Sequence, residues 1–345
     1  MFLPEVYFCL QTTSLTISKS IARNIVFPLV TSLGIEKLFA ALSENNKLIL
    51  VYHGVVETPD PAVSVGPISI RQFEQHLGYF KKNFDVVSQE DLFRMYHEGY
   101  KPGKKTVAIT FDDGYENNYR NAFPLLKKFN FPSTMYIISQ CVEDENMLTW
   151  YDYLDFVKPD LDVKAMTLPG LKATPPENMG ELKNLIKSLN IDQRKLVYSE
   201  IDKQVNVKKY IDKYPREFWK LMDKRQLKDL SDSGLVEIAA HSRNHPNLGE
   251  ISIEDAGREV IECKQQLESV IGKEVKSIAF PDGSYTDEVK KICLEAGYKN
   301  LLAVDYRCAS DNNDKSILPR YCLSSTTTFE SNMIAVNRAF KSYGF

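Results

Sequence analysis

Short apolar runs and longer amphipathic stretches alternate along most of the chain. The apolar runs are rich in β-branched residues and predict strands at residues 47–56, 84–87, 106–111, 133–139, 235–240, 275–280, 300–304 and 321–324. Between them, apolar residues recur at helical spacing and predict helices at 71–83, 91–98, 115–130, 225–233, 252–271 and 286–296. Strands that alternate with helices are typical of a parallel sheet or barrel covered by helices, so we expect an α/β fold.

The segment from residue 140 to residue 224 interrupts this alternation. It contains no clear core element, a loop with several Pro and Gly residues near 169–176, and polar helical patterns from residue 181 onward. A connection of this length is usually functional rather than a plain link between two elements. We expect a helical insertion that covers the C-terminal end of the strands and controls access to a site there.

Two adjacent carboxylates, Asp112 and Asp113, end the apolar run at 106–111. Burying two carboxylates side by side is costly unless a cation or a reaction uses them. In α/β proteins the chemistry is usually placed where the strands end. A plain strand-to-loop turn is the alternative, because Asp followed by Gly114 is a common turn sequence.

Two of the chain's five histidines, His241 and His245, follow the apolar run at 235–240. Imidazole is a frequent ligand of zinc and related ions, and two histidines four residues apart can face one ion. The helical zincin pattern does not fit, because Ser242 stands where Glu is required and Pro246 opposes a continuing helix. Two His and one Asp leave coordination positions open, as in catalytic metal sites. A pair of surface-loop histidines without a ligand is the alternative.

Five short motifs together resemble those of the polysaccharide deacetylases, carbohydrate esterase family four, which share the NodB-homology domain. Thr-Phe-Asp-Asp-Gly and His-Ser-x-x-His-Pro are similar to the first two family motifs, and Phe-Pro-Asp-Gly resembles the third. Tyr-His and Leu-Pro-Arg resemble the entry and closing motifs of one branch. The first three motifs lie at residues 110–114, 241–246 and 280–283. The entry motif lies before them at 52–53, and the closing motif lies after them at 318–320. They keep the family's order between about residues 47 and 330, which makes the combination far more specific than any single motif.

The resemblance implies a distorted (β/α) barrel of about seven parallel strands. It also implies a metal-dependent hydrolase that removes an N-acetyl group from an amino sugar. Asp113, His241 and His245 would bind one divalent ion, with zinc as the expected metal and cobalt, nickel or manganese as alternatives. Asp112 would be the general base, because the lone pairs of its metal-bound neighbour are already engaged.

The third motif would form the loop that binds substrate, made up of Pro281, Asp282, Gly283 and Tyr285. The main-chain N–H of Asp282 is the candidate donor to the oxyanion. Within the insertion, Trp150 and Tyr151 could stack on a sugar ring, although core packing is the simpler use of a single aromatic pair.

Two positions depart from the commonest family pattern. Ala279 stands where the third motif often has an arginine, and Arg320 stands where the closing motif often has the histidine that acts as general acid. Arginine cannot protonate a leaving amine, because its pKa stays above about 12. We therefore expect Arg320 to pair with Asp112 and keep it ionised, and His53 to be the candidate acid. A buried histidine bonded to the backbone is the alternative for His53.

Composition and charge narrow the partners and the compartment. The net charge of −3, without a basic run, argues against nucleic acid as a partner, and an N-acetylated amino-sugar polymer or glycan intermediate is expected instead. The six cysteines form no Cys-x-x-Cys pair, which argues against a cysteine metal site and favours a reducing compartment. Residues 1–18 lack the basic region and cleavage site of a signal peptide, so we expect a cytoplasmic protein or one peripheral at the membrane. The apolar stretch at 20–42 predicts an amphipathic helix on the domain, with contact to a membrane surface as the alternative.

We therefore expect five segments, namely an N-terminal helical extension (1–46), the first part of the deacetylase barrel (47–139), the helical insertion (140–224), the second part of the barrel (225–330) and a C-terminal tail (331–345). Two other functions stay open. One is a catalytically reduced sugar-binding protein, and the other is a deformylase or deacylase of a lipid-linked amino sugar. The intact Asp112 favours an enzyme, because a protein that only binds would not need a second carboxylate beside the ligand.

Overall fold

The computed structural model of the chain describes residues 22–60, 66–211 and 214–345. Its centre is a nine-stranded sheet with the order β10-β9-β8-β7-β6-β5-β1-β11, and β4 pairs with β5 off this path. Every strand pair in this sheet is parallel. The strands are β1 (Lys47–Tyr52), β4 (Asp85–Val86), β5 (Thr106–Phe111), β6 (Ser133–Ile137), β7 (Val236–Ala240), β8 (Ser277–Ala279), β9 (Asn300–Ala303), β10 (Ile317–Pro319) and β11 (Tyr321–Cys322). A separate parallel pair consists of β2 (Val55–Val56) and β3 (Ile68–Ser69).

One short segment closes the sheet into a barrel. β10 and β11 are separated only by Arg320, yet β10 pairs with β9 whereas β11 pairs with β1. The segment therefore pairs with β9 through β10 and with β1 through β11. Together, β10 and β11 act as the seventh barrel strand and join the two sides of the sheet. The expected barrel of about seven parallel strands is confirmed, and the break at Arg320 is its distortion.

An apolar layer fills the barrel beneath the strand ends. One residue from each of the seven barrel strands belongs to this cluster, namely Ile49, Ala108, Tyr136, Ala239, Ala279, Leu302 and Leu318. Because side chains on a strand alternate between its faces, residues two positions further along point the same way. Those residues include Thr110, His241 and Arg320, so polar groups follow directly above the apolar layer.

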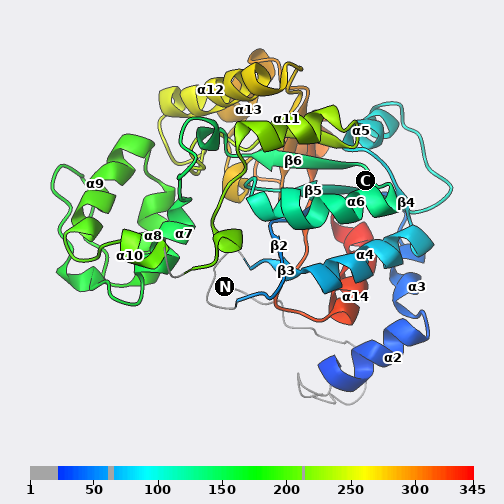
Figure 1. Cartoon of the computed structure of the whole chain (residues 1–345). Coiled ribbons are helices and arrows are strands. Elements are labelled where there is room, and N and C mark those ends of the chain that lie inside the picture. Colours follow the sequence, from blue (N-terminus) through cyan, green and yellow to red (C-terminus); the bar gives the residue numbers. More distant parts are fainter. Residues whose placement is uncertain (1–21, 61–65, 212–213) are drawn as a thin grey trace.

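Helices cover the outside of the barrel (Figure 1). The predicted helices occur within two residues of the expected bounds, except that the helix expected at 115–130 begins as a π-helical turn at Asn118–Ala122. Ser69 and Ser252 cap α4 and α12 through their side chains, and left-handed Gly272 ends α12. The covering helices are α4 (Ile70–Asn83), α5 (Gln89–His97), α6 (Phe123–Phe129), α11 (Lys224–Asp232), α12 (Ile253–Ile271) and α13 (Asp287–Glu295).

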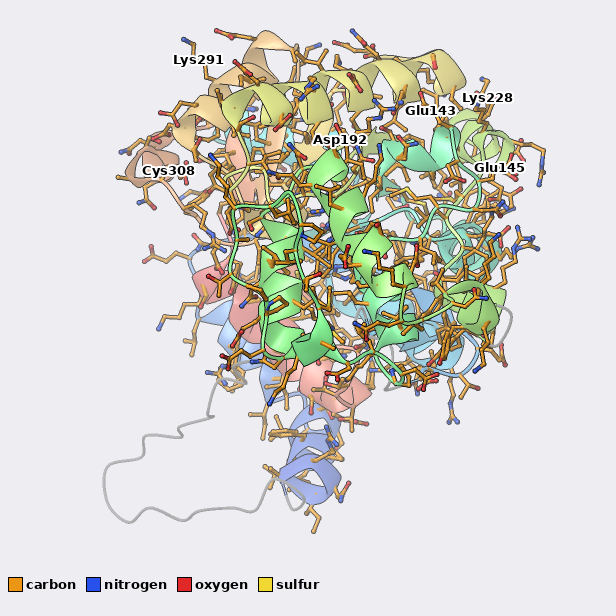
Figure 2. The ribbon with its side chains drawn as sticks, turned by 90° about the vertical axis from the view of Figure 1, so that its left-hand side faces the viewer. Glu143, Glu145, Asp192, Lys228, Lys291 and Cys308 are labelled. Atoms are coloured by element: carbon orange, nitrogen blue, oxygen red, sulfur yellow. The ribbon has the colours of Figure 1, made fainter. Side chains whose placement is uncertain are left out.

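The insertion folds as a group of helices at one end of the barrel. It contains α7 (Trp150–Val157), α8 (Met179–Lys187), α9 (Ile191–Asp202) and α10 (Lys208–Ile211). These helices lie to the left of the sheet in Figure 1, and in Figure 2 they stand in front of the barrel, with Asp192 labelled at the start of α9. All eight residues of α7 are buried, so the insertion does contain a core element, contrary to expectation. Six of its eight residues are apolar or aromatic, and its two aspartates, Asp152 and Asp155, are buried as well, so every face of α7 is covered.

Helices also flank the barrel at both ends of the described chain. A π-helical turn (Ala22–Val26), α2 (Phe27–Ser32) and α3 (Glu36–Ala41) precede β1. The last residues, expected only as a tail, form α14 (Phe329–Ser342), which packs against α3 and buries Met333, Val336 and Phe340. The N-terminal stretch up to residue 21 lies outside the described residues. Within the described ranges, no helix combines the length and the apolar character needed to cross a membrane.

Short 3₁₀ turns complete the described elements. They lie at Ser139–Val142, Val163–Ala165, Arg216–Phe218, Pro281–Gly283 and Ala309–Asn313. The turn at Pro281–Gly283 follows β8 after one residue, Phe280, and places the third motif at the same end of the barrel as the two Asp residues after β5.

Candidate active site

The expected metal ligands come together where β5 and β7 end. Asp112 and Asp113 directly follow β5, His241 directly follows β7, and His245 lies further along the loop that joins β7 to α12. Asp113 Oδ1 lies 3.6 Å from His241 Nε2 and 3.5 Å from His245 Nε2. All of these side chains are buried.

The three ligand atoms fit a single divalent ion. They lie within 4.8 Å of one another. Two ligands at ordinary zinc distances in tetrahedral geometry are about 3.4 Å apart, close to the separations observed from Asp113. His241 Nδ1 donates to the carbonyl oxygen of Ala279 at 2.8 Å, because a carbonyl group can only accept. This bond leaves the lone pair of Nε2 facing Asp113, as a metal-binding histidine requires.

Two aromatic residues of α7 pack against His245. Trp150 Nε1 donates to His245 Nδ1 at 3.3 Å, because an indole N–H can only donate. The rings of Tyr151 and His245 meet edge to face, with centroids 5.5 Å apart. Trp150 and Tyr151 are 5% and 6% exposed, so the pair packs within the protein as expected and offers no open platform for a sugar.

Arg320 and Asp112 form a buried ion pair joined by two hydrogen bonds. Arg320 Nη1 and Nη2 donate to Asp112 Oδ1 and Oδ2 at 2.7 and 2.8 Å. Burial alone would raise the pKa of Asp112, but the charges of Arg320 and His241 outweigh it and hold that pKa well below its ordinary range. The guanidinium also lies 5.0 Å from the ring centroid of Tyr136 in the apolar layer. The pairing expected from the sequence is therefore present, and it favours the ionised form of Asp112.

Asp113 has the opposite electrostatic character in the absence of a cation. Burial raises the pKa of Asp113 to about 7, although the charge of His53 acts to lower it, and the adjacent Asp112 carboxylate raises it further. A divalent cation beside Asp113 would reverse this shift, because it favours the ionised carboxylate. The two neighbouring carboxylates are thus already differentiated, one by a permanent guanidinium and the other by a site suited to a cation.

Backbone strain is concentrated at this site. Five non-glycine residues in the described part of the chain have positive φ, and one of them, Asn130, caps a helix. The other four lie in the candidate site, namely Asp113 (φ 71°), Ser242 (58°), His245 (56°) and Asp282 (51°). Such conformations are costly for residues with a Cβ and persist only where the surroundings impose them, as they do at functional sites.

His53 lies near the carboxylates without pairing closely with them. It directly follows β1, and its main-chain carbonyl accepts a hydrogen bond from Asn118 Nδ2 at 2.8 Å. Its charge acts to lower the pKa of both Asp112 and Asp113. This position is compatible with a proton donor at the site, and the acid role of His53 stays a prediction.

The third motif presents a main-chain donor and an ion pair. The described residues offer no hydrogen-bond acceptor to the main-chain N–H of Asp282, which lies in the turn at Pro281–Gly283. Asp282 Oδ2 lies 3.1 Å from Lys187 Nζ of α8. The Tyr285 hydroxyl donates to Asp311 at 2.8 Å, so it is engaged within the protein. The roles of Pro281, Asp282, Gly283 and Tyr285 toward substrate stay predictions.

Three charged residues that the sequence patterns did not single out also contact the site. Lys187 of α8 pairs with Asp282, while Arg194 of α9 and Glu259 of α12 hold the loop that carries the histidines. Each is one of several charged residues in its helix, and charged residues are common on the solvent face of a helix. No local signal separates these three from their solvated neighbours, so only their contacts reveal them.

A family model described as polysaccharide deacetylase matches residues 99–301. "Putative polysaccharide deacetylase YxkH" of Bacillus subtilis is 25% identical over 181 residues, which are 51% of this chain and 60% of that protein. The chain therefore matches less than two thirds of the length of that relative. Poly-beta-1,6-N-acetyl-D-glucosamine N-deacetylase of Staphylococcus aureus is 21% identical over 300 residues, covering 81% of this chain and 80% of that protein.

Solved structures show the same fold. IcaB from Ammonifex degensii has a TM-score of 0.56 at 17% identity and covers 86% of this chain and 99% of that one. Streptococcus pyogenes deacetylase PplD has a TM-score of 0.55 at 19% identity and covers 83% and 97%. The match at 99–301 spans more than half of the chain and includes Asp112, Asp113 and both site histidines, while His53 and Arg320 lie outside it. The chain belongs to the polysaccharide deacetylase family.

Proposed function

We propose that this protein is a metal-dependent hydrolase that removes the N-acetyl group from an amino sugar in a polysaccharide or glycan precursor. The observation that carries the proposal is the cluster of Asp113, His241 and His245 beside the ion-paired Asp112. Membership of the family supports the reaction type. The name of the Staphylococcus aureus relative supports a polymer of N-acetylglucosamine as the class of substrate.

The two carboxylates divide the work. When bound by Asp113 and the two histidines, a divalent ion would act as a Lewis acid on the amide carbonyl and lower the pKa of the attacking water. Asp112 accepts the proton of that water, because Arg320 keeps it ionised. The same ion pair makes Asp112 a weak base, which suffices only for a water that is already acidified.

Main-chain and histidine groups complete the reaction. The main-chain N–H of Asp282, free of a partner among the described residues, donates to the oxygen on which negative charge develops. The departing amine needs a proton, which Arg320 cannot supply. His53 supplies it, because it stands close enough to influence the pKa of both carboxylates.

The test begins with metal content, which needs no knowledge of the sugar. The purified protein should contain, or take up, about one zinc, cobalt or nickel ion per chain, and Asp113→Asn and His241→Ala should lose it. Asp112→Asn is the matched control, because it removes the neighbouring carboxylate and should keep the metal. Failure to bind any of the three ions would contradict the proposal and favour a sugar-binding role.

Activity is then measured as acetate released from N-acetylglucosamine oligomers. The loaded protein should release acetate, a chelator should abolish the release, and added metal should restore it. Asp112→Asn should be at least about 10²-fold slower while still holding its ion. Full activity of Asp112→Asn would remove this residue from the mechanism.

A further inference from the structure

The loop that carries both histidines is held from two directions. The main-chain carbonyl groups of residues 242–245 all accept hydrogen bonds. The first two accept from the N–H groups of Ser139 and Gln140, which follow β6, at 3.2 and 3.0 Å. The last two accept from Arg194 of α9, whose Nη1 and Nη2 donate to them at 2.9 and 3.2 Å. A helix of the insertion therefore supplies half of the anchoring of these carbonyl groups.

Arg194 makes only main-chain hydrogen bonds in the described part of the chain. Its Nε donates to the Ile186 carbonyl of α8 at 2.9 Å, in addition to the bonds to Asn244 and His245. The side chain is 2% exposed, and burial lowers the pKa of its guanidinium. Burying a guanidinium is costly, so its persistence here requires that the bonds it makes compensate. No main-chain N–H of the described residues donates to the Asn244 or His245 carbonyl, so Arg194 is their partner.

A carboxylate also holds the same loop. Glu259 of α12 accepts from the main-chain N–H of Asn244 at 2.6 Å and from its Nδ2 at 2.7 Å. Glu259 is itself buried. Asn244, which directly precedes His245, is therefore fixed between a cation from the insertion and an anion from the barrel's covering helix.

This anchoring matters because the loop is strained. Ser242 and His245 both have positive φ, which costs non-glycine residues about 1–2 kcal/mol each. The backbone at His245 determines where its imidazole points, and metal ligands must lie within about 0.2 Å of their ideal distances. The bond from the His245 N–H to Ser242 Oγ at 2.9 Å is local and cannot fix the loop relative to Asp113. The N–H groups of Ser139 and Gln140 anchor the first half of the loop from outside, and Arg194 and Glu259 provide the external reference next to His245.

We propose that Arg194 is a positioning residue of the metal centre. Through the carbonyl groups of Asn244 and His245, it holds the His245 imidazole where a divalent ion requires it. The insertion is thereby a structural part of the metal site as well as its cover. This inference rests on the proposed function only in requiring that Asp113, His241 and His245 bind a metal ion.

Cobalt binding to the full chain tests the inference. Metal-free protein is titrated with Co²⁺, the ligand-field absorption is recorded, and the affinity is measured by competition with a chelator. Arg194→Met, which preserves much of the volume and removes all three donors, should bind Co²⁺ about 10- to 100-fold more weakly, with an altered spectrum. Arg194→Lys keeps a charge but lacks the fork of donors, so its affinity should lie between those of Arg194→Met and the unmodified chain.

The matched control is Tyr153→Phe, which acts inside the insertion without touching the loop. It removes the 2.7 Å bond from the Tyr153 hydroxyl of α7 to Asp202 of α9. Its Co²⁺ affinity and spectrum should be unchanged, even if its thermal stability falls as far as that of Arg194→Met. An equal loss of affinity in Tyr153→Phe would show a general effect of insertion stability and overturn the inference.

Two further outcomes separate this inference from the proposed function. If Arg194→Met folds and its Co²⁺ affinity and spectrum are unchanged, the inference is overturned while the proposed function stands. If Arg194→Met does not fold, unchanged Co²⁺ binding by Arg194→Lys overturns the inference in the same way. Absence of Co²⁺ binding by the unmodified chain overturns the proposed function, and the inference with it.

Discussion

Arg320 is the one residue between β10 and β11, the two short strands that close the barrel, and its guanidinium pairs with Asp112. The two residues are 208 positions apart in the sequence, yet Arg320 Nη1 donates to Asp112 Oδ1 and Nη2 donates to Oδ2. Closure of the barrel and ionisation of the proposed base therefore depend on the same segment, because β10 and β11 meet at Arg320.

Removing Arg320 should raise the pKa of Asp112. A carboxylate whose folded-state pKa is depressed contributes stability above its unfolded pKa and loses it as the pH falls through the folded pKa. In Arg320→Met, burial is no longer opposed by this charge, so Asp112 takes up a proton at higher pH. The acid limb of the pH dependence of kcat/KM should move upward, and stability at neutral pH should fall by about 3–5 kcal/mol. Arg320→Lys, which keeps the charge, is the control. An unmoved acid limb in Arg320→Met would contradict the pairing role.

Substituting His53 should impair proton donation and leave the metal in place. His53→Gln should lower kcat by about 10²–10⁴-fold and change the alkaline limb of the pH–rate profile. Metal content is measured in parallel and should be unchanged, because His53 is not among the three clustered ligands. His97→Gln, at an exposed histidine of α5, is the matched control and should behave as the unmodified protein. An unchanged alkaline limb in His53→Gln would remove His53 as the acid.

Metal binding should break the hydrogen bond between Trp150 and His245. With Trp150 donating to Nδ1, a neutral His245 carries its proton on Nε2, the atom that faces Asp113. Ligation through Nε2 requires the proton on Nδ1, which leaves two donors facing each other. Zinc should therefore change the fluorescence of Trp150 with a one-to-one endpoint. Trp219→Phe isolates this signal, because the chain has two tryptophans. A constant signal during stoichiometric zinc uptake would show that Trp150 keeps its partner.

His76 should make the fold less stable in mild acid. Burial lowers the pKa of His76 to about 3, from an ordinary value of 6.5. Between about pH 3 and pH 6.5, His76 is therefore protonated in the unfolded chain and neutral in the folded chain. The free energy of unfolding falls as the pH drops below about 6.5. The linkage amounts to about 2 kcal/mol between pH 7 and pH 5.

The measurement is urea unfolding at both pH values. Because Tyr52 Oη bonds His76 Nδ1 at 2.9 Å, both proteins carry Tyr52→Phe, and one also carries His76→Phe. The protein that keeps His76 should lose about 2 kcal/mol more between pH 7 and pH 5. Equal pH dependence in the two proteins would show that His76 is not the group responsible.

The sequence by itself determined the local elements and the chemical groups. Buried strands such as β5 and capped helices such as α12 follow from side-chain pattern and capping, which are short-range properties. Asp112, Asp113, His241 and His245 were likewise visible, because metal ligands at strand ends are unusual residues in apolar surroundings. Their motifs indicated the fold, since the family's motifs lie at the ends of particular barrel strands.

Only the tertiary structure decided how distant segments complete the site. Neither the division of the closing strand at Arg320 nor the buried course of α7 follows from local periodicity, because pairing partners and covering helices come from elsewhere in the chain. Arg194 is one arginine among many polar residues of the insertion, and its place in the site depends on two carbonyl groups some 50 residues away. Hydrogen bonds to main-chain carbonyls carry no sequence signature on the acceptor side, so such contacts can be found only in the folded molecule.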